Sequence, residues 1–286
     1  MRYEAPVSVE AASTLLSEAP GQSFVLAGGT DLLVRMKGGF VEPDLIVDIK
    51  HIAALQEIRL EKDGFVIGAA VPCAALSENA ELRKQWPGVV EAANLIGSKQ
   101  IQGRCTMVGN LCNASPAADS VPALIAAGAK VRIRGRKGTR SAAVEEIPVG
   151  PGRTSLAKGE FIEAILLKKR KPRSADAYLR FIPRSEMDIA VVSAGVDLEL
   201  DKAGAVAAAR VALGAVAPTV KLVEAAAAAI IGSKLEDKAL QALAEACSAA
   251  CQPINDKRGT IEFRTKVAGV LARRAAQIAF QRAGER

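Results

Sequence analysis

Two short stretches of the chain combine glycine with small polar residues, a composition typical of loops that hold phosphate groups. The first, LAGGTDLL, places Gly28 and Gly29 at the end of an apolar run, with Thr30 directly after them. Consecutive glycines let several backbone N–H groups converge on an anion, because no Cβ atoms block its approach. Considered alone, this stretch predicts either a simple turn or a phosphate loop.

The second stretch, TMVGN, offers the hydroxyl of Thr106, the bare backbone of Gly109 and the amide of Asn110. Asp119 follows nine positions after Asn110. A hydroxyl and backbone amides suit a pyrophosphate, whereas a carboxylate suits a sugar hydroxyl. The two stretches together therefore predict a dinucleotide held from two sides.

The residue spacing does not support other common sites. No G-x-G-x-x-G motif follows a strand and the run GRKGTR lacks the P-loop spacing, so neither nucleotide fingerprint is present. His51 is the only histidine, which leaves no zinc site with the scattered cysteines and no Ser-His-Asp triad. Cys105 and Cys112 flank the second stretch, and we interpret them as small buried residues, with a redox role as the alternative.

The composition bounds the class of protein. With 286 residues, of which 50% are hydrophobic, the chain is long enough for two domains with sizeable cores. Aromatic residues make up only 3%, which argues against nucleic-acid binding by stacked aromatics. The net charge of +7 indicates an anionic ligand, a basic partner surface or a solvated basic face. The five cysteines form no C-x-x-C pair, and no signal peptide or membrane span is recognised, so we expect a cytoplasmic protein.

The elements around these stretches follow from periodicity. Helical spacing over residues 7–16, with Ser8 as N-cap, precedes the short strand SFVLAGG, and DLIVDI and GFVIGAAV are further strands. GVVEAANLIG is helical, and a polar loop of about 14 residues starts at Arg104. In the strand AKVRIRG, Val131 and Ile133 alternate with arginines, which predicts a half-buried strand with the arginines facing outward.

The second half begins with a charged segment, KKRKPRSAD over residues 168–176, which we interpret as a solvated junction between domains. Two antiparallel strands, DIAVVSAGVDLEL and VAAARVALGAV, follow it. The chain from Pro218 onward is alanine-rich helix. Cys247 and Cys251 are four positions apart, and we expect both on the packed face of one helix.

These motifs, taken in order, resemble the FAD-binding medium subunit of molybdenum hydroxylases, the xanthine dehydrogenase and carbon monoxide dehydrogenase group. The matching segments include YEAPVSVEAASTLL, LAGGTDLLVRMKGG, TMVGNLCNASPAADSVPAL, VGPGRTSLAKGEFIEAI and INDKRGTIEFRTKVAGVLARRAAQIAF. The resemblance implies an α+β fold whose residues 1–172 form a PCMH-type FAD-binding domain, with subdomains at about 1–58 and 59–172. Residues 175–286 would form a C-terminal domain with a three-stranded antiparallel sheet and helices.

The resemblance also implies roles for individual residues. The pyrophosphate and ribityl part of FAD would contact Ala27, Gly28, Gly29, Thr30, Asp31, Thr106, Gly109 and Asn110. Asp119 would contact a sugar hydroxyl, and Ile165 would lie close to the flavin ring. Arg180 would stand at the pyrimidine edge of the ring, with Arg184 as the second candidate for this cation.

Two positions depart from the family pattern. The second stretch usually reads T-[IL]-G-G-N, and Val108 replaces its first glycine, so the β-branched side chain is expected to change the shape of the loop. Arg180 stands where members usually carry lysine, which keeps the charge but alters reach and donor geometry. Some members also carry a cysteine-rich loop for a [4Fe-4S] cluster, which Cys73, Cys105 and Cys112 do not reproduce, so we predict no metal in this chain.

The implied activity is that of an oxidoreductase flavoprotein subunit with noncovalent FAD, since Thr30 replaces the histidine to which related flavoproteins attach flavin. Molybdopterin would belong to a large partner subunit and [2Fe-2S] clusters to a small one, in a dimer of heterotrimers. Electrons would pass from the clusters through FAD to an external acceptor. The alternative is a nucleotide-binding regulatory module of the same fold without flavin redox activity, which Val108 favours. A self-sufficient flavin oxidase is disfavoured, because such an enzyme needs catalytic tyrosines and the chain has two tyrosines in all.

Overall fold

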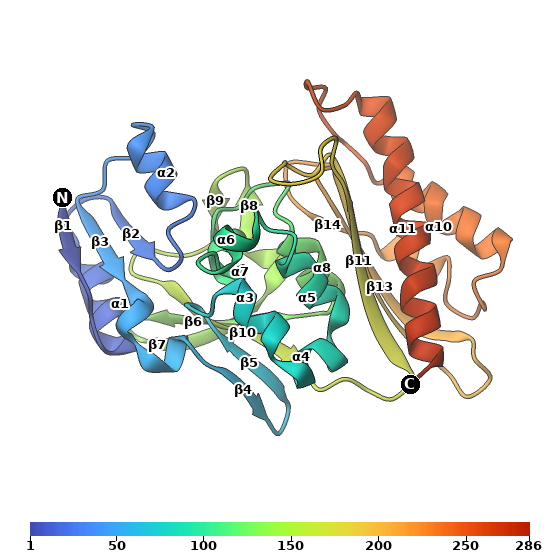
Figure 1. Cartoon of the computed structure of the whole chain (residues 1–286), viewed down its shortest axis with the longest axis horizontal. Coiled ribbons are helices and arrows are strands. Elements are labelled where there is room, and N and C mark those ends of the chain that lie inside the picture. The colour runs from blue at the N-terminus through green and yellow to red at the C-terminus, as the bar shows by residue number, and fades with distance from the viewer.

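The computed structural model describes residues 1–286, and three main β-sheets succeed one another along the chain (Figure 1). The first sheet has the order β1-β3-β2 and is parallel throughout. Its elements are β1 (Arg2–Glu4), α1 (Val9–Glu18), β2 (Ser23–Leu26), α2 (Leu32–Lys37) and β3 (Leu45–Asp48). Ser8 caps α1 by accepting a hydrogen bond from the Ala11 N–H at 3.2 Å, as the sequence predicts.

The second sheet is antiparallel, with the order β4-β5-β10-β6-β7. Its strands are β4 (Ile58–Glu61), β5 (Gly64–Gly68), β6 (Lys130–Gly135), β7 (Gly138–Ala143) and β10 (Phe161–Lys168). Val131 and Ile133 of β6 are fully buried, and the arginines between them are partly exposed, so the predicted alternation is confirmed. A two-stranded ribbon, β8 (Pro148–Gly150) and β9 (Arg153–Thr154), lies between β7 and β10 in the chain.

Short helices fill the long connection between β5 and β6. They are α3 (Cys73–Glu78), α4 (Ala80–Gln85), α5 (Pro87–Ala93), α6 (Lys99–Gln102), α7 (Met107–Cys112) and α8 (Ser120–Ala126). The polar loop predicted from Arg104 onward is therefore wrong, because most of the second stretch is α7. The Thr106 side chain supplies an N-cap. This cap stabilises the first turn of α7 although Gly109 and Asn110 have low helix propensity.

The third sheet has the order β11-β12-β13-β14 and is antiparallel. Its strands are β11 (Ser174–Phe181), β12 (Val192–Leu200), β13 (Val206–Gly214) and β14 (Lys221–Leu222). Three long strands agree with the prediction, and the two-residue β14 adds a short fourth. The helices that follow are α9 (Glu224–Ala228), α10 (Asp237–Ala249) and α11 (Ile261–Gly284).

The third sheet lies between two layers of helices (Figure 1). α11 packs on β11 and β12, while α5 and α8 pack on the sheet from the side of the second sheet. Gly195 of β12 allows this close approach, since a Cβ there would lie 2.6 Å from the carbonyl oxygen of Pro122 in α8. The helices α5 and α8 and the third sheet are thus in direct contact.

The charged junction between β10 and β11 is solvated only in part: Lys169, Lys171 and Pro172 are exposed, as the sequence predicts, whereas one arginine is buried. The Arg170 side chain is 4% exposed and forms ion pairs with Asp176 at 3.0 Å and Asp197 at 2.6 Å. Its guanidinium also lies 3.7 Å from the centroid of the Trp86 ring. A block of like charge usually faces water, but here acidic partners on β11 and β12 draw one arginine inside.

Two hydrophobic clusters form the core, one across the first two sheets and the other between the third sheet and its C-terminal helices. Cys247 is buried in the second cluster, whereas Cys251 lies beyond the end of α10 and is only partly buried. The prediction that both share one helix face is therefore wrong for Cys251, because the helix ends first.

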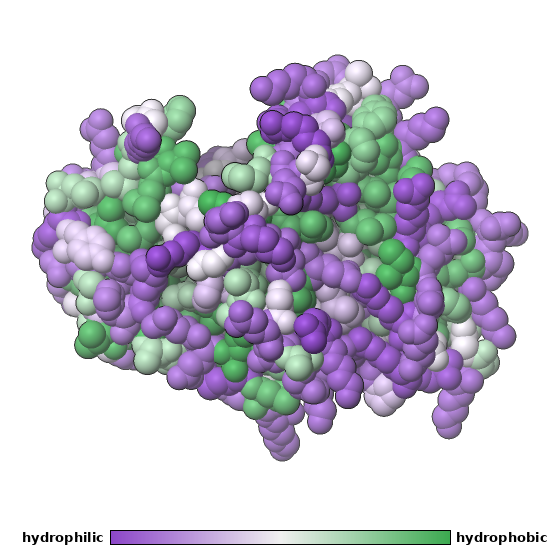
Figure 2. Space-filling view, in the orientation of Figure 1, coloured by the Kyte–Doolittle hydropathy of each residue, from purple (hydrophilic) through white to green (hydrophobic).

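Hydrophilic side chains are spread over the face seen in Figure 2 rather than gathered in one patch. This distribution fits a solvated surface. None of the helices combines the length and the apolar character that crossing a membrane requires.

Candidate functional site

A cavity of about 600 Å³ opens between the first sheet and the second, within the size range of ligand sites, ~300–1,000 Å³. Three parts of the chain line it: β2 with the loop after it, the segment around α7, and the segment from Gly152 to Ile162 that leads into β10. All eight residues that the sequence assigns to the pyrophosphate and ribityl region lie in its wall. These are Ala27, Gly28, Gly29, Thr30, Asp31, Thr106, Gly109 and Asn110.

The loop between β2 and α2, residues 27–31, presents free backbone donors. None of its N–H groups meets a hydrogen-bond acceptor of the chain, although the Gly29 carbonyl accepts from Leu33 N–H at 3.0 Å. Gly29 has φ +77°, a conformation that other residues rarely adopt. A run of unpaired N–H groups on a cavity wall is costly unless water or an anion accepts from them.

Gly28 serves a different purpose. A Cβ on Gly28 would overlap the Arg104 carbonyl oxygen and lie 2.8 Å from the Cα of Cys105. The bare backbone at Gly28 therefore allows the first loop to pack against the chain that leads into α7. Sequence reasoning explained this glycine by the ligand alone, whereas the structure shows that the protein itself requires it.

The second stretch forms the start of α7. Thr106 Oγ1 accepts a hydrogen bond from the Gly109 N–H at 2.9 Å, and the Thr106 carbonyl accepts from Asn110 N–H at 3.0 Å. The N–H groups of Met107 and Val108 have no acceptor in the chain. Val108 is helical and 93% buried in this turn. Its β-branched side chain is therefore accommodated in an ordinary helical backbone conformation.

Asn110 is held in one orientation. Its Oδ1 accepts from the Ser120 N–H at 3.1 Å and from the Ser120 hydroxyl at 2.7 Å. Because the oxygen is occupied, the Nδ2 amide group is the part of the side chain left to donate into the cavity. Asn110 therefore joins the cavity wall to the first residue of α8.

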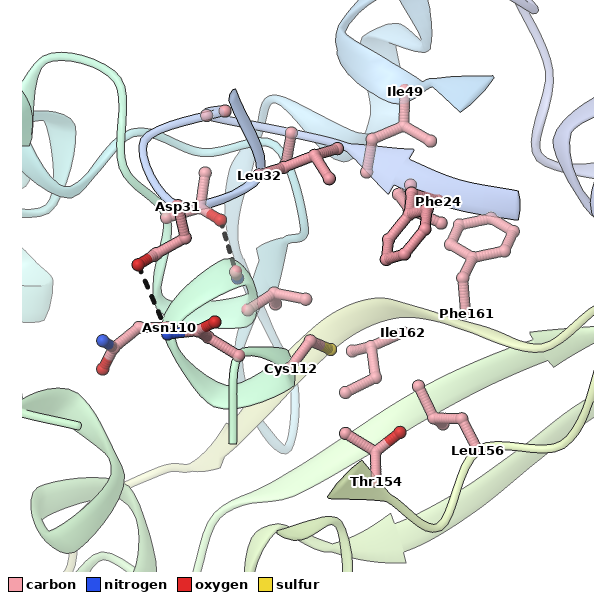
Figure 3. A pocket seen from close by; sticks show the side chains of 18 of the residues that line it. Phe24, Asp31, Leu32, Ile49, Asn110, Cys112, Thr154, Leu156, Phe161 and Ile162 are labelled. Carbon is pink, nitrogen blue, oxygen red and sulfur yellow. Dashed lines mark hydrogen bonds between the residues drawn. The ribbon is translucent and has the colours of Figure 1, made fainter. Parts of the chain in front are cut away.

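Asp31 connects the first loop to the residue that follows α7. Asn113 Nδ2 donates to Asp31 Oδ1 at 3.3 Å, and Figure 3 shows Asp31 and Asn110 at the same end of the cavity. Burial raises the pKa of the Asp31 carboxyl, and the positive charge of Arg35 opposes this shift. Arg35 and Lys158 both line the cavity, so its wall carries cations as well as N–H donors.

The opposite part of the cavity is apolar. Phe24, Leu156, Phe161 and Ile162 lie there in Figure 3, away from Asp31 and Asn110. Sequence reasoning missed these residues, since each sits in an apolar run that suits a protein core equally well. A cavity with donors at one end and apolar side chains at the other suits a ligand that joins a phosphate group to a flat ring.

Four of the residues assigned from the resemblance do not line the cavity. Asp119 and Arg180 form a buried ion pair at 2.9 Å, and Tyr178 Oη donates to Asp119 Oδ1 at 3.3 Å. Ile165 is fully buried within β10, where it pairs with Ile67 and Val131 in the sheet. Arg184 is also apart from the cavity, exposed and paired with Asp188 at 3.0 Å.

The Asp119 pair nevertheless lies directly behind the cavity wall, because Asp119 precedes Ser120, the partner of Asn110. Burial raises the pKa of Asp119 to about 6, and the guanidinium of Arg180 and the hydroxyl of Tyr178 oppose this shift.

The residues present fit FAD. Its two phosphates need several hydrogen-bond donors, which residues 27–31 and the start of α7 supply, and its flat rings need apolar surface, which the region around Phe24 and Phe161 supplies.

Comparison with known proteins agrees with this geometry. The family described as "FAD binding domain in molybdopterin dehydrogenase" matches residues 1–167, and "CO dehydrogenase flavoprotein C-terminal domain" matches residues 177–279. The medium chain of carbon monoxide dehydrogenase from Hydrogenophaga pseudoflava is 32% identical over 98% of this chain and 97% of its own length. A putative xanthine dehydrogenase FAD-binding subunit from Escherichia coli is 29% identical over 99% of this chain and 97% of its own length.

A solved structure shows the same architecture. The match is to reconstituted CO dehydrogenase from Oligotropha carboxidovorans, with a TM-score of 0.94 and 32% identity, and it covers 98% of this chain and 97% of that one. The chain therefore belongs to the family of FAD-binding medium subunits of molybdenum hydroxylases, which are oxidoreductase flavoproteins.

Proposed function

We propose that this chain holds FAD noncovalently in the cavity between the first loop and α7. The observation that carries the proposal is the set of N–H groups of residues 27–31, which have no acceptor in the chain and border a cavity of about 600 Å³. They would hold the pyrophosphate, with Thr106 and Gly109 on the facing wall. FAD, when bound, supplies the acceptance and release of electrons, and the protein supplies position and electrostatics.

Individual residues take distinct parts in this proposal. The Nδ2 group of Asn110 would donate to the ribityl chain or to a phosphate oxygen, because its other end is held by Ser120. Asp119, Ile165 and Arg180 do not line this cavity, so their proposed contacts with a sugar hydroxyl, the flavin ring and its pyrimidine edge require FAD to extend beyond it. Thr30 offers no ring nitrogen for covalent attachment, which supports a noncovalent cofactor.

The partners and place of action are also proposed. Relatives are named medium chains and FAD-binding subunits, which supports a large molybdopterin subunit and a small [2Fe-2S] subunit as partners in a dimer of heterotrimers. Electrons would then leave the clusters of the small subunit and reach an external acceptor by way of this chain. Five free cysteines suit the reducing cytoplasm. We place the two domains at residues 1–172 and 175–286.

The test is the absorbance spectrum of the purified chain after addition of FAD and desalting. We expect retained flavin absorbance, released on acid denaturation and identified as FAD. Asn110→Asp keeps the acceptor for Ser120 but turns a carboxylate oxygen into the cavity, and should raise the Kd for FAD at least about tenfold, or ~1.4 kcal/mol.

The matched control is Asn94→Asp. The Oδ1 of Asn94 accepts from the Ser77 hydroxyl at 2.6 Å outside the cavity, so this change adds the same charge without facing the ligand. Equal FAD affinity in both variants would contradict the assignment of Asn110. A chain that never retains flavin but binds other nucleotides would instead favour a regulatory module without redox activity.

A further inference from the structure

Cys73 and Cys105 are brought together at the base of the cavity. The Cys73 N–H donates to the Cys105 carbonyl at 2.8 Å, and both residues are buried free cysteines. With standard backbone bond lengths, an N···O distance of 2.8 Å keeps the two Cα atoms within about 6.7 Å of each other. A disulfide spans Cα separations of ~4.4–6.8 Å, so the backbone permits one here. The two side chains are therefore placed where a bond between their sulfurs needs little movement.

Only one of the two thiols borders the cavity. Cys105 lines it, directly before Thr106 and against Gly28, whereas Cys73 begins α3 behind it and has no exposed surface. A small reagent that enters the cavity thus reaches Cys105 first, and Cys73 stands behind it as the next thiol.

The electrostatic surroundings distinguish Cys105 from the other cysteines. The neighbouring Cys73 thiol lowers the pKa of Cys105, although burial and the carboxylates of Asp31 and Asp119 act against it. The same contact raises the pKa of Cys73. Cys112 also lines the cavity, but burial raises its pKa to about 12. Thiolate is the reactive form, so Cys105 is the more nucleophilic of the two cavity cysteines.

We propose that Cys105 is a site of oxidative modification, that Cys73 is its resolving thiol, and that a hydroperoxide reaches Cys105 only while the cavity is empty. The protection by ligand rests on the proposed function, whereas the modification itself does not. The proposed chemistry gives the cofactor-free chain a covalent mark that the loaded chain does not acquire.

The reaction balances in two steps. The Cys105 thiolate attacks one oxygen of hydrogen peroxide and becomes a sulfenic acid, while the other oxygen leaves as hydroxide and takes a proton to form water. The Cys73 sulfur then attacks the Cys105 sulfur and displaces hydroxide, which takes up the Cys73 proton and leaves as a second water. In total the two thiols lose two electrons and two protons to the peroxide.

The experiment treats the purified chain with hydrogen peroxide, with and without FAD, and follows it by alkylation and peptide mass analysis under non-reducing conditions. Without FAD we expect a Cys73–Cys105 cross-linked peptide that is two hydrogens lighter and is reversed by a thiol reductant. With FAD its rate of formation should fall at least about tenfold.

Two variants separate the roles of the cysteines. Cys73→Ser should abolish the cross-link and leave a sulfenic acid at Cys105 that a dimedone probe captures. Cys112→Ser is the matched control, because it removes the other cavity thiol and should leave the cross-link unchanged.

The outcomes separate a failure of the proposed cysteine modification from a failure of the proposed FAD binding. If Cys105 in the cofactor-free chain stays unmodified at peroxide levels that oxidise free cysteine, the proposed site is overturned, whether or not FAD binds. If flavin is retained but the cross-link forms at the same rate, the claim of access through the cavity is overturned. If no flavin is retained and the cross-link forms, the modification stands and the proposed function fails.

Discussion

Arg180 Nη1 donates a hydrogen bond to Asp119 Oδ2 at 2.9 Å, and both side chains are almost fully buried. The resemblance to flavoprotein subunits assigns these two residues separately, one to a sugar and the other to the flavin ring. In the structure each balances the charge of the other. Because Asp119 precedes α8 and Arg180 belongs to β11, the pair also ties the flavin module to the C-terminal sheet.

The raised pKa of Asp119 predicts a pH dependence of stability. Its folded-state pKa of about 6 lies above the ordinary value of 3.8, so the folded chain binds more protons than the unfolded chain between these two values. Stability should therefore fall as pH rises through this window, by up to ~3 kcal/mol for Asp119 alone. Urea unfolding at pH 4.5 and pH 7 measures the fall.

The variant Asp119→Asn isolates this contribution. Asn keeps the size of the side chain but does not titrate, so the difference in unfolding free energy between the two pH values should shrink by ~1–3 kcal/mol. Asp197, whose pKa burial raises to about 7, contributes equally to both proteins and cancels in the comparison. An unchanged difference would show that Asp119 does not carry the slope.

Gly28 predicts a loss of affinity that comes with a loss of stability. Gly28→Ala places a Cβ against the Arg104 carbonyl and the Cys105 backbone, neither of which is a flexible side-chain end. The first loop must then move away from α7, which should destabilise the fold by ~1–3 kcal/mol and weaken FAD binding. Equilibrium unfolding and FAD titration test the two effects.

Gly39 provides the control for this substitution. It has φ +69° and a Cβ there meets nothing within 4 Å, so Gly39→Ala should cost only the ~1 kcal/mol of the left-handed conformation and leave FAD affinity intact. If Gly28→Ala and Gly39→Ala lower stability and FAD affinity equally, the close packing of Gly28 against Arg104 and Cys105 does not contribute to either.

The N-cap role of Thr106 predicts that serine can replace it and that alanine cannot. Thr106→Ala removes the acceptor for the Gly109 N–H and should destabilise the chain by ~0.5–2 kcal/mol, as N-cap losses do. Thr106→Ser keeps the hydroxyl and should retain both stability and FAD affinity. If Thr106→Ser lowered stability as much as Thr106→Ala, the stabilisation would come from the methyl group of Thr106 and not from its hydroxyl cap.

Sequence reasoning recovers the parts of this fold that local periodicity controls. The capped α1, the alternating β6 and the long antiparallel β12 and β13 follow from short-range pattern. It also identifies the two polar segments that line the cavity, residues 27–31 and 106–110, although the second is a helical turn and not a loop. The apolar end of the cavity could not be found this way, since Phe24 and Phe161 come together only through tertiary packing.

Buried charge is the other feature that local pattern hides. The acidic partners of Arg180 and Arg170 lie on other elements, so the sequence near each arginine does not show them. The N-cap of α7 is hidden in a similar way, because threonine, glycine and asparagine are also typical of loops. A charged side chain is assigned to the surface by default, because burying it is costly without a partner. Only the folded arrangement shows which arginines have one.

Arg170 predicts the largest effect of a single substitution. It is paired with Asp176 and Asp197, and its guanidinium stacks on Trp86 at 3.7 Å from the ring centroid. Arg170→Met would leave the buried Asp176 carboxylate without its counter-charge. Removing one partner of a buried pair costs ~3–5 kcal/mol, and the loss of the aromatic contact adds to this.

The neighbouring cation Lys171 is a matched control for Arg170, and a triple variant tests the cause. Lys171 pairs with Glu199 at 2.9 Å but is largely exposed, so Lys171→Met should change stability by no more than ~1 kcal/mol. Adding Asp176→Asn and Asp197→Asn to Arg170→Met removes the uncompensated charge and should recover part of the lost stability in urea unfolding. A triple variant no more stable than Arg170→Met alone would assign the loss to the contact with Trp86, and the junction would then be held by guanidinium–indole stacking rather than by the ion pairs.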